Sequence, residues 1–169
     1  MATVTFKGTP FKTSGSLPAA GTPAPGFLLT GGNLSDVTLN SFASKTVILN
    51  IVPSLDTGVC ALSAKRFNAE ATSLPNTVIV TISADLPFAQ KRFCDAEKLA
   101  NITIASTFRA PAFGKDYGVL LVEGPLAGLM SRAVMVIDAK GLVVYTEQVP
   151  EIAQEPNYDA ALKAVKALA

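Results

Sequence analysis

The stretch VILNIVPSLDTGVC, residues Val47–Cys60, decides the fold of this 169-residue chain. Residues 47–52 are β-branched and almost wholly apolar, which is typical of a strand that is buried on both faces. The chain then passes through Pro53 into a helix predicted over residues 58–72, because apolar side chains recur there at every third or fourth position. Cys60 therefore lies where a buried strand gives way to the first turn of a helix.

Strands and helices continue to alternate after this junction. A strand is predicted over residues 77–83, followed by a helix that Asp85 caps, that has Pro87 in its first turn and that ends near Ala100. Further along the chain, the predictions are a third strand at 102–106, a short helix at 111–117, a hairpin of strands 133–137 and 142–147 and a final amphipathic helix at 158–168. Before residue 47, an N-terminal β-hairpin is predicted within residues 4–12 and a short turn at 38–42.

This order of elements predicts an α/β protein. Alternation requires parallel strands with right-handed crossovers, and the late hairpin adds antiparallel strands to the same sheet. The expected architecture is a thioredoxin-like fold, with a mixed central sheet flanked by helices and an N-terminal β-hairpin, in a single domain over residues 1–169. In such sheets, reactive groups collect beyond the carboxyl ends of the parallel strands, where Cys60 is expected.

Composition excludes several classes of function. The chain carries 14 basic and 13 acidic residues, so it has no positive field for nucleic acid or for an anionic membrane. No apolar run approaches the roughly 20 residues of a membrane helix. Residues 1–7 lack the charged and apolar regions of a secretory signal, so a cytoplasmic location is expected.

The cysteine and histidine counts narrow the chemistry further. The chain has two cysteines and no histidine, which removes Ser–His and Cys–His nucleophile pairs and leaves too few ligands for a tetrahedral zinc site. In a cytoplasmic chain of this size, the two cysteines favour a catalytic disulfide over a structural one. No metal or organic cofactor is expected.

Cys60 is the candidate nucleophile. The N-terminus of its helix carries partial positive charge and free N–H groups, which favour a thiolate over a thiol. If the helix begins at Gly58, Thr57 is its N-cap, and the Thr57 hydroxyl is close enough to donate to the thiolate or to hold a substrate oxygen. Pro53 lacks an N–H and stiffens the approach to the loop, which helps to shield the site from water.

Arg132 is expected beside Cys60, although the two residues are far apart in the sequence. It directly precedes the strand predicted at 133–137, and if that strand runs antiparallel to strand 47–52, its beginning lies beside the end of the latter. The guanidinium would then point at the sulfur, stabilise the thiolate and bind a polar oxygen group through its donor fork.

Cys94 is predicted on the polar face of the second helix. An exposed thiol there suits a resolving role, in which it forms a disulfide with the oxidised Cys60. The two cysteines are 34 positions apart, so they are no Cys-x-x-Cys motif. Contact between them requires local unfolding of one helix or both. The expected polar neighbours of Cys94 are Gln90, Lys91, Glu97 and Lys98, and the expected apolar face consists of Leu86, Ala89, Phe93, Ala96 and Ala100.

Each assignment has a plainer alternative. Cys60 could be a small core residue, Arg132 a surface or ion-pair arginine, and Cys94 an incidental surface thiol. Arg109, which lies in a Thr-Phe-Arg run, is assigned a structural role, with a dimer contact as the alternative.

The motif PSLDTGVC, residues 53–60, resembles the peroxidatic motif of the bacterial thiol peroxidases, an atypical two-cysteine branch of the peroxiredoxins. The runs SADLPFA at 83–89 and RFC at 92–94 resemble the segment that carries this family's resolving cysteine. The runs YGV at 117–119, GPL at 124–126, SRAV at 131–134 and EPNY at 155–158 match as well, and the resemblance covers essentially the whole chain.

The resemblance implies a mechanism. Cys60 would attack hydrogen peroxide or an organic hydroperoxide to give a sulfenic acid, with Thr57, Arg132 and backbone N–H groups orienting the peroxide. Cys94 of the same chain would then form a disulfide with Cys60, and thioredoxin would reduce it. The resemblance also implies a homodimer. The rival functions are a thioredoxin-like disulfide exchanger and a redox sensor.

Overall fold

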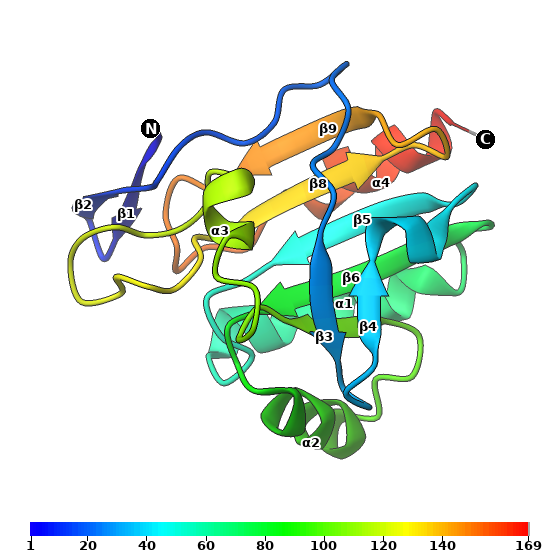
Figure 1. Ribbon diagram of the computed structural model, residues 1–169, viewed down its shortest axis with the longest axis horizontal. Helices are drawn as coiled ribbons and strands as arrows, with labels where there is room; N and C mark the ends of the chain where they lie inside the picture. The colour runs from blue at the N-terminus through cyan, green and yellow to red at the C-terminus, as the bar shows by residue number, and fades with distance from the viewer. Residues whose placement is uncertain (169) are drawn as a thin grey trace.

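A seven-stranded mixed sheet forms the centre of the molecule, and a separate two-stranded hairpin lies at one end (Figure 1). The computed structural model describes residues 1–168. In chain order the elements are β1 Thr3–Phe6, β2 Thr9–Lys12, β3 Leu28–Gly31, β4 Asp36–Thr38, the 3₁₀ helix η1 Leu39–Phe42, β5 Thr46–Ile51, α1 Gly58–Ala71, β6 Thr77–Ser83, α2 Pro87–Glu97, β7 Thr103–Ser106, α3 Phe113–Asp116, β8 Ala133–Ile137, β9 Val143–Gln148 and α4 Tyr158–Lys166.

The strand order in the large sheet is β4-β3-β7-β6-β5-β8-β9. The three central strands β5, β6 and β7 are parallel, and β8 and β9 extend the sheet antiparallel on the side of β5. The predicted α/β architecture with a mixed sheet and an N-terminal hairpin is therefore confirmed. The predicted bounds of the strands at 77–83 and 133–137 are also those of β6 and β8.

Helices cover the sheet on both sides, α1 and α4 behind it and α3 in front in the view of Figure 1. Successive side chains of a strand point to opposite faces, so β5 contributes Leu49 to the core cluster of one face and Ile48 to that of the other. Phe67 from α1 packs in the second cluster with Leu162 from α4. Among residues 1–168, no helix combines the length and apolarity that crossing a membrane would require.

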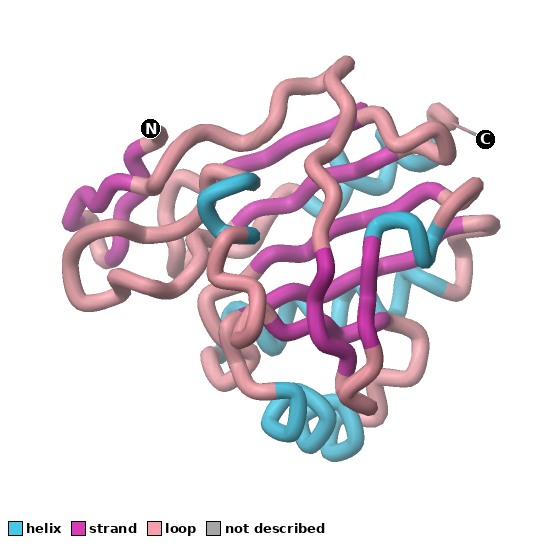
Figure 2. Tube along the Cα trace, viewed as in Figure 1, coloured by secondary structure: helices cyan, strands magenta, loops and turns pink. Residues whose placement is uncertain are grey.

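The strands β3 and β4 were missed by the sequence prediction. They cross the front of the sheet at one edge, where β3 pairs antiparallel with both β4 and β7 (Figure 2). They span only four and three residues, and a turn at residues 32–35 separates them. Segments this short show no alternating apolar pattern, so pairing with β7 rather than local sequence determines them.

The second helix differs from its prediction at both ends. It begins at Pro87 with Leu86 as N-cap, so Asp85 is not the capping residue that the sequence suggested. It ends at Glu97, three residues before the predicted end, because Lys98 adopts a left-handed conformation with φ 56°. The Asp85 carboxylate is thereby free to bind elsewhere.

The N-terminal hairpin is fixed to the segment that follows β9. Thr5 N donates to Pro150 O over 2.7 Å, and Ile152 N donates to Thr5 O over 2.8 Å. The buried Ile152 side chain packs with Val4 of the hairpin and with Leu121. The position of Ile152 therefore depends on the hairpin, which matters because its carbonyl contacts the site described below.

The Glu151 carboxylate holds this attachment and makes it sensitive to acid. It accepts hydrogen bonds from Ala153 N, Thr5 Oγ1, Gly8 N and Lys7 N, and these bonds, with that from Ala153 the largest, lower its pKa from 4.5 to about 2. Because the pKa is lower in the folded state, the stabilisation is complete above about pH 4.5 and is lost as the pH falls towards 2.

We expect the amide protection factors of Lys7 and Gly8, measured by hydrogen exchange and corrected for the intrinsic pH dependence, to fall across this window. Glu151→Gln should show the low protection already at neutral pH, because its amide accepts fewer of these bonds. The amides of β8 serve as the internal control. Protection of Lys7 and Gly8 that stays constant from pH 5 to about 2 would contradict this account.

Candidate active site

Four segments of the chain meet at one edge of the sheet. The parallel strands β5, β6 and β7 all end there, and β8 begins there because it runs antiparallel to β5, with Ala133 opposite Ile51. The loop after β5, which leads to Cys60, therefore lies beside the residue that precedes β8, Arg132. The antiparallel pairing on which the sequence argument depended is confirmed.

Arg132 contacts the sulfur of Cys60 directly. Its Nη2 lies 3.3 Å from Cys60 Sγ, and its Nε donates to Ile152 O over 3.0 Å. Its own carbonyl accepts from Val149 N over 3.0 Å. Arg132 as a whole is only 1% exposed, and its Nη1 has no hydrogen-bond partner within residues 1–168. The side chain is therefore held in place while one of its donor nitrogens stays available.

The charge of Arg132 is unusual for a buried group. The three ion pairs formed by residues 1–168, Lys65–Glu97, Arg66–Glu70 and Lys91–Asp95, lie at the surface, and none of them includes Arg132. A buried cation without a counter-charge is costly. A thiolate at Cys60, 3.3 Å away, would supply that counter-charge. Cys60 is also the third residue of α1, where the helix dipole stabilises negative charge.

Thr57 is the N-cap of α1, as predicted, but its hydroxyl is directed elsewhere in this conformation. Oγ1 donates to Ser54 O over 3.1 Å and makes no capping bond. Of the hydrogen bonds made by residues 1–168, the only side-chain bond to Cys60 Sγ comes from Arg132, so the expected bond from Thr57 is not formed. Pro53 is buried and follows directly on the last residues of β5.

Cys60 has no exposed surface. Its side chain lies in an apolar cluster with Val52, Leu55, Ala64 and Cys94. The sulfur is therefore shielded from bulk solvent in this conformation.

The prediction that Cys94 is exposed is wrong. Cys94 is 8% exposed and packs in the same cluster as Cys60. The faces of α2 are reversed relative to the prediction because Gln90 takes a core position: its Nε2 donates to Ser83 Oγ over 2.8 Å and to Ala105 O over 3.0 Å. The buried side of α2 is therefore Pro87, Gln90 and Cys94, whereas Leu86, Ala89, Ala96 and Ala100 are exposed and Phe93 is half-buried.

The two thiols are in different electrostatic environments. Burial, with a smaller effect of the neighbouring Asp95, raises the pKa of Cys94 to about 11, so this thiol stays protonated at neutral pH. The charge of Lys91 opposes this rise but has the smallest of the three effects. Both cysteines are free in this structure. The two cysteines therefore have different surroundings: a buried guanidinium contacts Cys60, whereas burial dominates the environment of Cys94.

Sequence reasoning missed one part of this edge, the Asp85 carboxylate. It accepts hydrogen bonds from Ser54 Oγ, Leu55 N and Ser83 Oγ, each over 2.7 Å. The signal was present, because Ser83 and Asp85 follow a buried parallel strand and polar residues in that position gather at the same sheet edge as Cys60. Arg109, by contrast, has the structural contact that was expected, since its Nε donates to Thr30 Oγ1 over 3.1 Å.

Comparison with known proteins places this geometry in a family. The sequence pattern of the Redoxin family matches residues 19–162. The thiol peroxidases of Mycobacterium tuberculosis (strain H37Rv) and Mycobacterium bovis are each 54% identical over 167 residues, covering 99% of this chain and all of theirs.

Solved structures agree with the sequence comparison. A peroxiredoxin-like protein from Aquifex aeolicus superposes with a TM-score of 0.94 at 40% identity, covering 100% of this chain and 98% of its own. A thiol peroxidase from Chromobacterium violaceum gives a TM-score of 0.91 at 28% identity, covering 98% and 95%. A thiol beside a buried arginine, on a chain similar to these relatives along its whole length, leads to one conclusion: this chain belongs to the Redoxin family and, within it, to the thiol peroxidases.

Proposed function

We propose that this protein is a thiol-dependent peroxidase that reduces hydrogen peroxide and organic hydroperoxides. The contact between Arg132 Nη2 and Cys60 Sγ carries the proposal. A buried guanidinium without a carboxylate partner favours a thiolate, and the thiolate is the form of cysteine that attacks oxygen. The unpartnered Nη1 of Arg132 is available for an oxygen atom of the peroxide.

The first step forms one bond and breaks one. The Cys60 thiolate attacks the terminal oxygen of the hydroperoxide, an S–O bond forms and the O–O bond breaks. Cysteine is oxidised to sulfenic acid, and the departing oxygen takes a proton from water to leave as water or an alcohol. Arg132 and the free amides of the first turn of α1 stabilise the charge that develops on the departing oxygen.

Thr57 and Pro53 contribute to the same step. The Thr57 hydroxyl donates a hydrogen bond to Ser54 O. The Thr57 oxygen can therefore still accept a hydrogen bond from the protonated oxygen of the peroxide. Pro53 fixes the backbone where β5 ends and keeps an N–H group out of the buried approach to the loop.

The second step converts the sulfenic acid into a disulfide. Cys94 of the same chain attacks the sulfenic sulfur of Cys60, a disulfide forms and water leaves. A thioredoxin-type dithiol then reduces this disulfide by thiol–disulfide exchange. The buried, protonated state of Cys94 requires that α2 or the Cys60 loop rearranges before this step.

The rate of peroxide loss tests the function. Reduced protein mixed with substoichiometric peroxide is expected to consume it orders of magnitude faster than free cysteine does, and addition of thioredoxin, its reductase and NADPH should give multiple turnovers. Alkylated protein, with both thiols blocked, is the control. Peroxide loss at the rate of a free thiol would instead favour the disulfide exchanger or the redox sensor.

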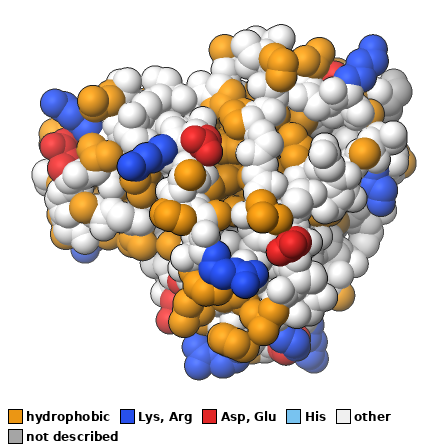
Figure 3. All heavy atoms as spheres, in the orientation of Figure 1, with side chains coloured by type: hydrophobic (Ala, Val, Ile, Leu, Met, Phe, Trp, Pro, Cys, Tyr) orange, Lys and Arg blue, Asp and Glu red, His pale blue; other side chains and the backbone are white. Residues whose placement is uncertain are grey.

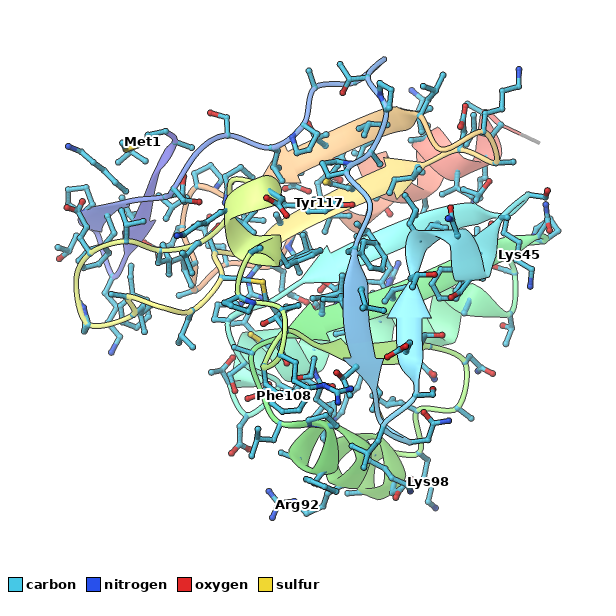
Figure 4. All side chains as sticks on the ribbon, viewed as in Figure 1. Met1, Lys45, Arg92, Lys98, Phe108 and Tyr117 are labelled. Carbon is cyan, nitrogen blue, oxygen red and sulfur yellow. The ribbon has the colours of Figure 1, made fainter. Side chains whose placement is uncertain are left out.

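We further propose that two copies associate and that they act in the cytoplasm, where thiols are kept reduced. Figure 3 shows apolar side chains gathered over α2, and the exposed ones there include Leu86 and Phe88, with Phe108 on the loop after β7 (labelled in Figure 4). An exposed apolar face of this kind suits a second copy of the chain. Light scattering should give the mass of two chains, and a monomer at every concentration would contradict the association.

A further inference from the structure

The loop that leads to the nucleophile, residues 52–57 (the Cys60 loop), is tied to the start of the helix that carries the second thiol through one carboxylate, that of Asp85. Oδ1 accepts from Ser54 Oγ over 2.7 Å, and Oδ2 accepts from Leu55 N and Ser83 Oγ over the same distance. Asp85 lies two residues before α2 begins at Pro87. Hydrogen bonds to an ionised carboxylate are stronger than neutral ones.

These bonds also organise the rest of the loop. Ser54 Oγ accepts from Asp56 N over 3.2 Å, and Ser54 O accepts from Thr57 Oγ1 over 3.1 Å. The Thr57 hydroxyl and the start of α1 are thus positioned through Ser54, which is itself positioned by Asp85. The backbone of Asp85 is fixed in turn, because its carbonyl accepts from Ser106 Oγ.

Other polar contacts between the loop and α2 are weaker, although Leu55 also packs with Cys94 in the apolar cluster. A cavity of about 260 Å³ separates Leu55 and Asp56 from the side chains of Ala89, Arg92 and Phe93 (Arg92 is labelled in Figure 4). The ion pair Lys65–Glu97 joins α1 to α2, but both side chains are largely exposed, and such pairs contribute little. The Asp85 carboxylate is therefore the main polar link between the two cysteine-bearing segments.

In the proposed mechanism, this link breaks during the disulfide step. In the sheet, β8 with Arg132 lies on one side of β5, and α2 connects the strands β6 and β7 on the other side. Cys60 Sγ contacts Arg132, so it must leave the guanidinium and turn towards α2 before it can bond to Cys94. That motion displaces the residues that Asp85 binds.

We propose that Asp85 is a positioning residue that acts as a latch: it holds the Cys60 loop in the arrangement that reacts with peroxide and opposes the arrangement that forms the disulfide. This role rests on the proposed peroxidase function. Asp85 touches neither the peroxide nor the reacting sulfur. Its removal should therefore affect the two chemical steps in opposite directions.

Asp85→Asn tests the latch. An amide of the same shape keeps one acceptor oxygen but presents an N–H₂ group to at least one of the three donors. We expect oxidation of Cys60 by hydrogen peroxide to slow about tenfold and disulfide formation from the sulfenic acid to accelerate about tenfold. The chain contains no tryptophan, so the readout is rapid chemical quench, alkylation and intact mass spectrometry, which separates thiol, sulfenic acid and disulfide.

Two further variants complete the design. Ser54→Ala removes one bond of the latch and should shift both rates in the same directions by smaller factors. Asp36→Asn removes an exposed carboxylate on β4, at the far edge of the sheet, and should match the wild type. Thermal unfolding of every variant monitors the fold.

The outcomes are distinct. A slower first step together with a faster second step supports the latch. If both rates fall together, the role of Asp85 is purely structural and the latch proposal is wrong. The proposal is also wrong if both rates are unchanged or if the first step is faster. If the wild-type protein itself is not oxidised rapidly, the proposed peroxidase function fails rather than the latch.

Discussion

Replacement of Cys60 by serine is expected to abolish peroxide turnover, whereas Cys94→Ser should consume one equivalent of peroxide per chain and then stop. A serine hydroxyl beside Arg132 is not ionised at neutral pH and cannot be oxidised in this way. Without Cys94 the first oxidation is still possible, because the contact between Arg132 and Cys60 does not involve it. Peroxide consumption followed against protein concentration, without a recycling system, measures both values.

The same two variants test which thiol resolves the intermediate. In Cys94→Ser the sulfenic acid should persist long enough to be trapped and should advance to sulfinic acid with excess peroxide. Peptide mapping of oxidised wild-type protein should recover one link between residues 60 and 94 within a chain. Turnover by Cys60→Ser, or a link found only between two chains, would refute the assignment of these roles.

Arg132→Met is expected to lower the second-order rate constant with hydrogen peroxide by about 10²–10³, the range seen when one donor to a developing oxyanion is removed. The loss has two sources, because Arg132 stabilises the thiolate before the reaction and the departing oxygen during it. Arg132→Lys should be intermediate, since an ammonium keeps the charge but cannot reach Ile152 O and the sulfur with a rigid fork.

The thiolate absorbance at neutral pH separates the two sources. It should fall in Arg132→Met and recover in part in Arg132→Lys. Arg109→Met is the matched control, because Arg109 bonds to Thr30 rather than to sulfur, and its rate constant should stay near that of the wild type. A rate constant for Arg132→Met within about threefold of the wild type would mean that the contact seen here does not govern reactivity.

Most of the central fold could be predicted from the sequence, because the strands β5, β6 and β8 are long apolar runs with clear breaks around them. The contact of Arg132 with Cys60 followed from the same reasoning, since it needs only the pairing of two such strands. The strands β3 and β4 span only four and three residues and show no alternating apolar pattern, so they could not be found this way.

The errors at α2 have a different cause. The helical pattern placed Leu86, Ala89 and Phe93 in the core, but buried hydrogen bonds of Gln90 to Ser83 and Ala105 turn the helix to its other side. A polar residue at a core position is recognisable only when its partners are known, and those partners lie on two other strands. The same argument explains why Asp85 was taken for a helix cap rather than the group that organises the Cys60 loop.

The buried guanidinium gives the oxidation state of the sulfur control over the shape of the site. While Cys60 is a thiolate, its attraction to Arg132 draws the loop inward. In the sulfenic acid formed by the first step, the sulfur no longer carries the full negative charge, so the cation loses the anion that compensated it and water becomes a better partner. The oxidation of Cys60 thus favours opening of the Cys60 loop. Each peroxide that is reduced frees the sulfur to move towards Cys94, which completes the cycle.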